Sequence, residues 1–401
     1  MNVPTDLLRC TGCQCCRQLC PVGAITIDED TEGFPVPVID QQKCTDCGLC
    51  AERCPSNCGL TWHEPKRVMG ARYIRGDSAL AESSSGGACY AIAERFLTGG
   101  NAVVFGAALD QDNVCRHIGI SDISELHRLQ GSKYVQSDTG DTYRQAEQAL
   151  RTGKKVLFTG TPCQIAGLYQ YLGTQYDNLF TIDLICHGVP SPGLFRLYIQ
   201  YLEEKERDGK IIYFNFRPKA KLGWGVGSFL IKTETKTRFM PKFDNPYIIS
   251  FIADNCLREC CYQCQFTRTE RIGDLTAGDL WGVKETHTEF YDRRGSSVAL
   301  INTPKGERLA GILTETCSTI DTALDKVVPY QQMLSRPARR PESRDRLLRD
   351  IRGRGTDIFR QEEFKYPANV YWKKWMRYHF RWFLSAYNTV RRRLQVRKTR
   401  G

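Results

Sequence analysis

The sequence predicts an α/β protein with a small cysteine-rich module at its N-terminus and a basic helical tail. Three observations predict this organisation. One cysteine spacing occurs twice within the first 55 residues, apolar strand-like runs alternate with helical runs between residues 101 and 209, and basic and aromatic residues accumulate beyond residue 335. Alternating strands and helices are typical of a layered structure with a largely parallel sheet. We therefore expect three parts, at residues 1–63, 67–335 and 336–401.

The two cysteine runs read CTGCQCCRQLCP and CTDCGLCAERCP. Each has three cysteines separated by two residues, then a fourth after three more residues and a proline, which is the ferredoxin ligand run for a 4Fe-4S cluster. In two-cluster ferredoxins the fourth cysteine of each run reaches the other cluster. Paired C-x-x-C units also bind zinc, but the full run, present twice, favours clusters. We predict clusters on two sets: Cys10, Cys13, Cys16 and Cys54, and Cys44, Cys47, Cys50 and Cys20.

Composition limits the alternatives. No run of eighteen or more apolar residues is present, and the first residues lack a charged start followed by an apolar stretch, so we expect a cytoplasmic protein. Metal-binding thiolates among the 19 cysteines require a reducing, low-oxygen compartment. The net charge is +11, but residues 335–401 hold 20 Lys and Arg against six Asp and Glu. The remaining chain is close to neutral, which argues against nucleic acid as a partner of the body.

Strands are expected at residues 101–109, 155–163 and 179–188, and helices at 120–130, 141–153, 164–173 and 191–209. Residues 210–240 are expected to form strands joined by a glycine-rich loop. Ligands in such sheets lie at the carboxyl ends of strands, which places residues 159–164 and 186–190 at a cofactor site.

The SSSGG segment at residues 83–87 precedes a helical pattern, and both an anion site and a turn with a helix cap suit it. A third cysteine group lies within residues 256–264, and its spacing does not fix the ligands.

These segments together resemble the coenzyme F420 hydrogenase/dehydrogenase beta-subunit family over about residues 4–335. The resemblance is carried by the paired cysteine runs, SSSGG, GSKYVQSDTGDTY, GTPCQIAGL, DLICHGVPSP, the third cysteine group and IGDLTAGDLWG. Members of this family are flavoproteins with iron–sulfur clusters. Some pass electrons between FAD and a deazaflavin coenzyme, and others reduce chlorophyll-type pigments or belong with surface-polysaccharide genes.

The resemblance implies FAD in the α/β domain and a third 4Fe-4S cluster. Cys163 and His187 are candidate catalytic residues. Cys163 would act as a redox-active or proton-donating thiol, and His187 as a proton donor or as a partner of the cluster. An ordinary structural role is the alternative for each of them. The implied FAD lining is Ser84, Ser85, Gly86, Gly87, Lys133, Tyr134, Thr161, Pro162 and Gln164. The implied ligands of the third cluster are Cys186, Cys256, Cys261 and Cys264, with Cys260 as the alternative.

The implied function is an oxidoreductase that passes electrons through 4Fe-4S clusters to FAD and on to an organic substrate or a deazaflavin coenzyme. The built-in two-cluster module departs from the hydrogenase subunits proper, and it favours a soluble electron donor such as ferredoxin. The alternative is a non-catalytic electron-transfer subunit that serves a partner enzyme. An open pocket lined by Arg217, Lys219 and the Gly223-Trp224-Gly225 loop would favour the enzyme.

From residue 367 the tail carries an apolar and aromatic face at helical spacing, bordered by basic residues. Such a helix suits the surface of an anionic bilayer, and docking onto the body or a partner protein is the alternative. Nucleic acid is the third interpretation, and no known nucleic-acid module supports it. The face consists of Trp372, Trp375, Met376, His379, Phe383, Ala386, Tyr387, Val390 and Leu394.

Overall fold

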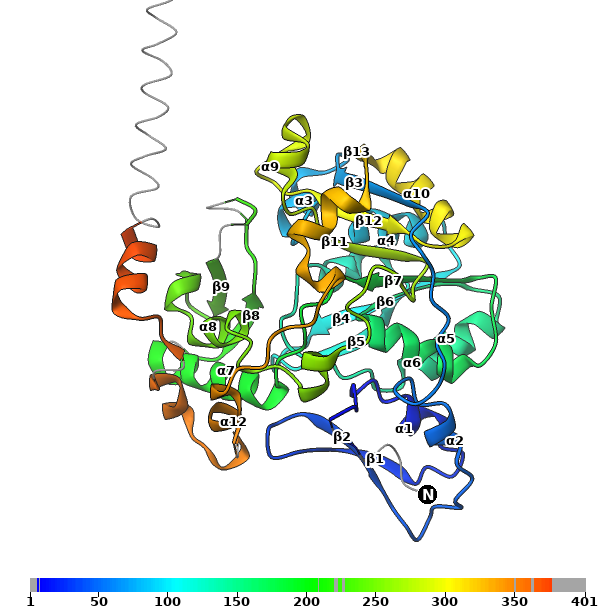
Figure 1. Cartoon of the computed structure of the whole chain (residues 1–401), viewed down its shortest axis with the longest axis horizontal. Coiled ribbons are helices and arrows are strands. Elements are labelled where there is room, and N and C mark those ends of the chain that lie inside the picture. Colours follow the sequence, from blue (N-terminus) through cyan, green and yellow to red (C-terminus); the bar gives the residue numbers. More distant parts are fainter. Residues whose placement is uncertain are drawn as a thin grey trace, which may run out of the picture.

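A small N-terminal domain lies below a large α/β body, and a second, smaller sheet lies beside that body (Figure 1). The computed structural model describes residues 6, 8–207, 209–219, 223–225, 228–349, 351–361 and 364–376. The N-terminal domain contains helices α1 (Cys15–Leu19) and α2 (Leu49–Glu52) and the antiparallel hairpin of β1 (Ile25–Glu29) and β2 (Pro35–Ile39).

The body is built on an eight-stranded mixed sheet with the order β13-β3-β12-β11-β7-β6-β4-β5. Its four central neighbours, β11, β7, β6 and β4, run parallel, and the outer strands pair antiparallel. The predicted α/β class is confirmed, with parallel pairing limited to the centre. The strands are β3 (Arg67–Tyr73), β4 (Ala102–Leu109), β5 (Cys115–Ile120), β6 (Lys155–Gly160), β7 (Leu179–Leu184), β11 (Leu275–Asp279), β12 (Ser297–Ile301) and β13 (Cys317–Thr322).

Helices cover both faces of this sheet. Side chains alternate along a strand, so in β6 Leu157 packs on one side while Val156 and Phe158 pack on the other. The first side carries α4 (Ala88–Thr98) and α10 (Pro304–Thr316), and the second carries α5 (Thr142–Arg151) and α6 (Pro162–Leu172). The helix predicted at residues 120–130 is a 3₁₀ helix, Ile123–Leu129. Shorter helices are α3 (Asp77–Glu82), α9 (Val283–Thr286) and α11 (Leu324–Val327).

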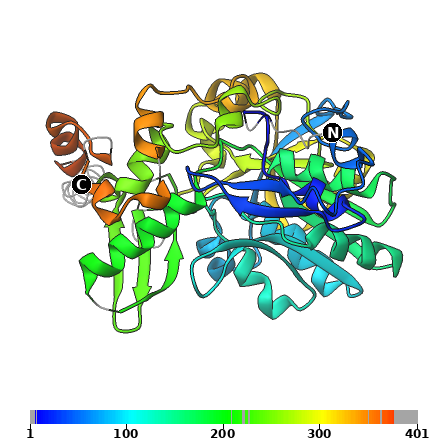
Figure 2. The ribbon, with the colours of Figure 1, turned by 90° about the horizontal axis from the view of Figure 1, so that it is seen from below.

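The smaller sheet is antiparallel and consists of β8 (Ile211–Asn215), β9 (Ser228–Thr233) and β10 (Thr237–Pro241). Helices α7 (Pro192–Glu206), α8 (Pro246–Ile252) and α12 (Ser343–Leu348) contribute to an aromatic core beside it. Figure 2 shows the ribbon of this part of the molecule from below. Apolar residues between positions 338 and 364 complete this core, so this part of the predicted tail domain packs on the body. Residues 368–376 are helical, and the rest of the predicted tail helix, residues 377–401, lies outside the described residues.

The N-terminal domain is fixed to the body by hydrogen bonds between main chain and side chains. Thr139 donates to the Cys13 carbonyl at 3.1 Å, and the Tyr143 amide donates to Gln18 Oε1 at 2.9 Å. The Gly193 amide donates to the Gly33 carbonyl at 3.0 Å, and an added Cβ on Gly33 would lie 2.7 Å from the Cα of Gly193. Glycine therefore permits this close approach. Among the described helices, none is long and apolar enough to cross a membrane.

Candidate functional site

The first predicted thiol set surrounds one hollow of the N-terminal domain. Cys10, Cys13, Cys16 and Cys54 line it together with Pro35, Pro37 and Pro55. Burial is the main cause that raises the pKa of the Cys13 thiol to about 12, and the nearby Cys54 and Cys10 thiols add to it. A thiol with this pKa ionises only when a metal takes the proton's place.

The second predicted set lines another hollow of the same domain. Cys20, Cys44, Cys47 and Cys50 surround it, and Cys47 is exposed at the surface. The Ala24 amide donates to the Cys20 thiol at 3.2 Å. The structure thus gathers the two sets of four that the crossed ferredoxin pattern predicts.

A third thiol group forms where the body meets the N-terminal domain. Cys163 lies in the first turn of α6 after β6, and Cys186 follows the end of β7. Cys261 and Cys264 come from a 3₁₀ turn and its C-terminal cap. Burial raises the pKa of Cys186 well above its ordinary value, and the thiols of Cys261, Cys163 and Cys264 raise it further. Four thiols from three separate chain segments therefore converge at the carboxyl ends of β6 and β7.

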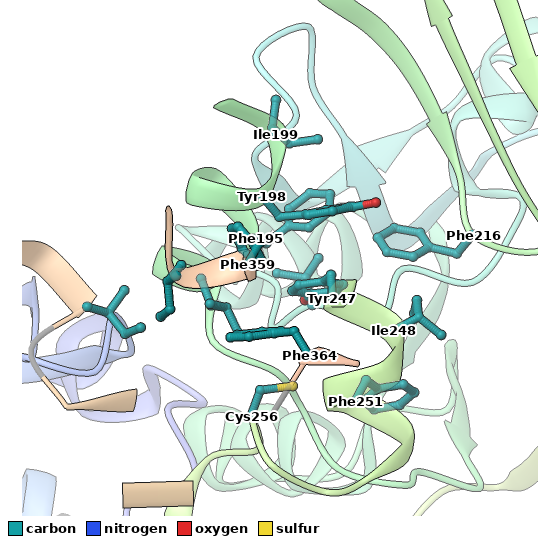
Figure 3. Close-up of a cluster of buried hydrophobic side chains, with 14 of the residues drawn as sticks. Phe195, Tyr198, Ile199, Phe216, Tyr247, Ile248, Phe251, Cys256, Phe359 and Phe364 are labelled. Carbon is teal, nitrogen blue, oxygen red and sulfur yellow. The ribbon is translucent and has the colours of Figure 1, made fainter. Parts of the chain in front are cut away.

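Cys256, which the family resemblance implied as a ligand, does not join this group. It is fully buried in the aromatic core with Tyr247, Phe251 and Phe364, as Figure 3 shows. The neighbouring charged groups that act on its pKa are Asp254 and Arg344, and no other cysteine does so. Cys256 belongs to the aromatic core that follows α8, and the chain reaches the third thiol group only at Cys261.

Cys163 occupies the place in the thiol group that Cys256 was expected to fill. Burial raises the pKa of Cys163 to about 12, and the thiols of Cys264 and Cys261 contribute. A thiol with this pKa is a poor proton donor near neutral pH, which argues against the catalytic role predicted for it. The alternative ligand Cys260 lies beside Cys261, and this neighbour together with burial raises the pKa of Cys260 well above its ordinary value.

The third thiol group touches the first N-terminal set through α6. An added Cβ on Gly167 would lie 3.1 and 3.2 Å from the Cβ and Sγ of Cys13. The thiols of Cys13 and Cys163 act on each other electrostatically, and both belong to one cluster of buried side chains. The two sites are therefore adjacent.

On its other side the third group leads to a pocket through aromatic side chains. His187, next to Cys186, bonds Asp254 through Nε2 at 2.6 Å and meets Phe251 edge-on at 5.0 Å between ring centroids. Phe251 stacks on Tyr134 at 4.9 Å, and both rings line the pocket. His187 thus lies between the thiol group and the pocket rather than inside the pocket.

The pocket is open to solvent on one side, and its space, part of it outside the protein, amounts to about 590 Å³. Arg217 forms two bonds with Asp279, at 2.7 and 3.0 Å, and Trp224 stacks on Trp281 at 4.7 Å. Burial, with a further contribution from Arg217, lowers the pKa of Lys219 to about 7. Its lining includes Ser84, Tyr134, Phe216, Arg217, Lys219, Gly223, Trp224, Gly225, Lys242, Phe251 and Trp281.

Some residues of the expected FAD lining do not reach the pocket. Lys133 Nζ donates to the main-chain carbonyls of Arg128 and Gln130 at 3.2 and 2.7 Å. An added Cβ on Gly86 would lie 2.2 Å from the Ala71 carbonyl oxygen, so this glycine serves close chain packing. Gly87 caps α4 with φ 82°, and Ser85 Oγ donates to the Ser296 carbonyl.

Thr161, Pro162 and Gln164 open α6 beside Cys163. Thr161 and Gln164 form a capping box, and Thr161 Oγ1 lies 3.1 Å from Cys163 Sγ. They belong to the thiol group's surroundings and not to the pocket lining. Of the expected FAD residues, Ser84 and Tyr134 line the pocket.

The described pocket residues fit a flavin nucleotide. Flat aromatic walls suit an isoalloxazine ring, and the Arg217 and Lys219 cations suit phosphate. Sequence reasoning missed Trp281 as a pocket residue and Asp279 as the partner of Arg217, although the IGDLTAGDLWG segment that contains them was noticed. It also missed Phe251, which carried no signal beyond an apolar helix.

Comparison with known proteins gives two family matches. Residues 9–58 match the model of a 4Fe-4S dicluster domain, and residues 153–320 match the C terminus of the coenzyme F420 hydrogenase/dehydrogenase beta subunit. A chain of the xenon-derivatised F420-reducing NiFe hydrogenase complex from Methanosarcina barkeri is similar at 15% identity and a TM-score of 0.44, over 68% of this chain and 88% of that one. No curated protein sequence matches. This chain is therefore an iron–sulfur electron-transfer protein that is related to the coenzyme F420 hydrogenase/dehydrogenase beta subunit over residues 153–320 and carries an N-terminal 4Fe-4S dicluster domain.

Proposed function

We propose that this chain is an iron–sulfur flavoprotein oxidoreductase. It takes electrons from a ferredoxin-like donor protein and reduces an organic substrate or a deazaflavin coenzyme. The observation that carries this proposal is the position of the third thiol group, Cys163, Cys186, Cys261 and Cys264. It is adjacent to the first N-terminal set through α6 and one aromatic layer from the pocket.

The cysteines would hold three 4Fe-4S clusters, which supply one-electron transfer. Cys10, Cys13, Cys16 and Cys54 would hold the first, Cys44, Cys47, Cys50 and Cys20 the second, and the third thiol group the last. Asp254 fixes the orientation of the His187 ring beside Cys186 through the bond to Nε2. Because Cys47 is exposed, the second set is the one that a donor protein can approach.

The pocket would hold FAD, which supplies the exchange between one-electron and two-electron chemistry when bound. Tyr134 and Trp281 would flank the ring, since flat aromatic side chains favour stacked contacts. Arg217 is held in place by its two bonds to Asp279, and it would orient an anionic group without losing side-chain freedom on binding.

The second candidate is a non-catalytic subunit that passes electrons to a partner enzyme. An open pocket beside the flavin favours an enzyme, because an organic acceptor needs access that electron tunnelling alone does not. The first candidate therefore requires that the pocket lined by Arg217, Lys219 and the Gly223-Trp224-Gly225 loop stays open to a substrate above the bound flavin ring. Partner proteins suit either candidate.

The test is anaerobic purification of the whole chain with iron, acid-labile sulfide and flavin measured per chain. The proposal expects about twelve iron atoms, from three 4Fe-4S clusters, and about one FAD. Reoxidation of the reduced flavin by small organic acceptors without a partner protein would favour the enzyme over the subunit. About eight iron atoms without flavin would overturn the proposal, because only the dicluster domain would then be loaded.

A further inference from the structure

Arg258 is a buried arginine whose hydrogen-bond partners are neutral. Its side chain is 3% exposed. Nε donates to the Cys10 carbonyl at 2.6 Å, and Nη1 donates to the Pro35 carbonyl and to Gln136 Oε1, both at 3.1 Å. Within the described part of the chain, no carboxylate forms an ion pair with it.

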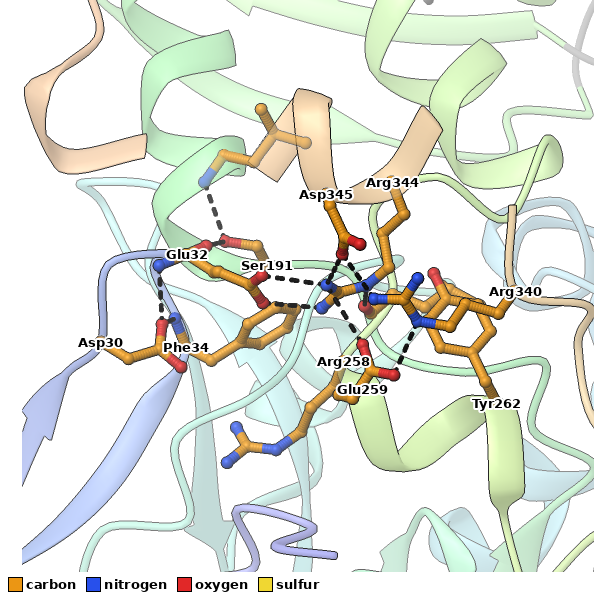
Figure 4. Close-up of polar contacts among 12 residues, drawn as sticks. Asp30, Glu32, Phe34, Ser191, Arg258, Glu259, Tyr262, Arg340, Arg344 and Asp345 are labelled. Carbon is orange, nitrogen blue, oxygen red and sulfur yellow. Dashed lines mark hydrogen bonds and ion pairs between the residues drawn. The ribbon is translucent and has the colours of Figure 1, made fainter. Parts of the chain in front are cut away.

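The other two deeply buried arginines have carboxylate partners. Arg271 pairs with Asp183 at 2.7 Å, and Arg344 pairs with Glu32 at 2.7 Å and with Glu259 at 3.2 Å. Figure 4 shows the guanidinium of Arg258 pointing away from the ion pairs of Arg344. Burial of a cation without a paired anion is strongly unfavourable, so the position of Arg258 requires more negative charge than the Asp30 carboxylate, which forms no ion pair with it, can supply.

Arg258 lies between two of the thiol groups. Its Nε donates to the carbonyl of Cys10, in the first N-terminal set, and its main-chain carbonyl accepts from the amide of Cys261, at the third thiol group, at 2.9 Å. Its guanidinium also packs against Gly12, where an added Cβ would lie 2.9 Å from Nη1. It therefore occupies the wall that separates the first set from the third group.

We propose that Arg258 is the shared counter-cation of the clusters at the first and third thiol groups, and that it raises the reduction potentials of both. The inference rests on the proposed function, because it needs clusters at these two positions. A 4Fe-4S core with four thiolates is an anion, and reduction adds one negative charge. A fixed buried cation stabilises the reduced form more than the oxidised form. Arg258 acts here as a positioning residue and would make the addition of an electron to either cluster more favourable in energy.

The test is a potentiometric titration of the whole anaerobic protein, followed by electron paramagnetic resonance, for the wild type and Arg258→Met. Methionine fills similar space without charge. We expect a lower potential for at least one cluster, by a tenfold change in the reduction equilibrium or more, which is about 59 mV for one electron. The control is Arg144→Met. Arg144 also joins body and N-terminal domain, through the Gln18 carbonyl at 2.9 and 3.1 Å, but its side chain is 47% exposed and water screens it.

The inference is overturned if Arg258→Met retains its full iron content and its reduction potentials match those of Arg144→Met. If Arg258→Met lacks iron, the same titration of Gln136→Glu tests the inference instead. This variant keeps Arg258 but places a carboxylate beside its Nη1, which neutralises the cation. Lower potentials in Gln136→Glu support the inference, and unchanged potentials overturn it. A wild type without the third cluster would contradict the proposed function instead, and the iron measurement detects this before any titration.

Discussion

Arg217 and Asp279 form a two-bond ion pair in the wall of the pocket, and Trp224 Nε1 donates to the same carboxylate at 2.7 Å. Both oxygens of Asp279 are thereby occupied. Lys219 instead donates to the carbonyls of Ser85 and Arg294, at 2.7 and 2.6 Å. The described lining therefore has more cationic than anionic side chains, and it favours an anionic ligand.

Binding of a phosphate-bearing ligand should weaken as Lys219 loses its proton. Burial lowers the pKa of Lys219 to about 7, so the side chain is a cation below this pH and neutral above it. We expect the affinity of flavin-free protein for FAD to fall about tenfold, or ~1.4 kcal/mol, between about pH 6 and pH 8. Quenching of FAD fluorescence at each pH measures it.

Two variants separate this effect from other titrating groups. Lys219→Met should bind FAD weakly at both pH values, and Lys219→Arg should lose the pH dependence while binding well, because guanidinium stays charged. A Lys219→Met protein with the wild-type pH profile would contradict the assignment.

The placement of Cys163 and Cys256 predicts opposite effects of two equal substitutions. Cys163→Ser should lower the iron content by about four atoms per chain, the size of one cluster. Cys256→Ser should keep full iron but reduce stability by about 1–3 kcal/mol, because a hydroxyl enters an apolar core. Iron analysis and denaturant unfolding of both variants measure this. Loss of iron in Cys256→Ser alone would restore the ligand set implied by the family resemblance.

The cysteine case shows what the sequence could and could not predict. The N-terminal sets follow from spacing, because one short loop supplies three ligands of each cluster. The third group draws on three segments, so its membership depends on how β6, β7 and the 256–264 segment pack. The central strands β4, β6 and β7 and the helices that alternate with them carry clear apolar periods and were predicted. Strands β3, β5, β11, β12 and β13 were missed, and all of these except β11 pair only antiparallel, outside the regular alternation of strands and helices.

The described part of the tail, residues 364–376, exposes large side chains that could bind a lipid surface. Tyr371 packs on Phe243 at 5.6 Å between ring centroids, whereas Trp372 and Met376 are 57% and 50% exposed. Exposed aromatic and sulfur-containing side chains beside lysines suit an anionic lipid surface. Deleting residues 367–401 should release the protein from sedimenting vesicles that contain anionic lipid. Equal sedimentation of the shortened and full chains would exclude the tail as the lipid-binding element, and neutral vesicles provide the control.

The ion pair of Arg271 and Asp183 should be the strongest point of attachment for the loop that carries Cys264. Arg271 is 2% exposed and also donates to the carbonyls of Phe266 and Arg268, while Asp183 accepts from the Gly273 amide at 2.8 Å. Arg271→Met leaves the Asp183 charge buried and unpaired.

Removing one partner of a buried ion pair lowers the free energy of unfolding by about 3–5 kcal/mol, and denaturant unfolding of the anaerobic protein should show this decrease. The matched control is Arg268→Met on the same loop. Arg268 pairs with Glu270 at 3.1 Å, with side chains 41% and 33% exposed, and exposed pairs contribute about 0–1 kcal/mol. The double variant Asp183→Asn with Arg271→Met should cost less than the sum of the single changes, because the unpaired charge is then absent. Equal costs for Arg271→Met and Arg268→Met would mean that burial does not strengthen this pair, and the loop would then depend on its apolar contacts instead.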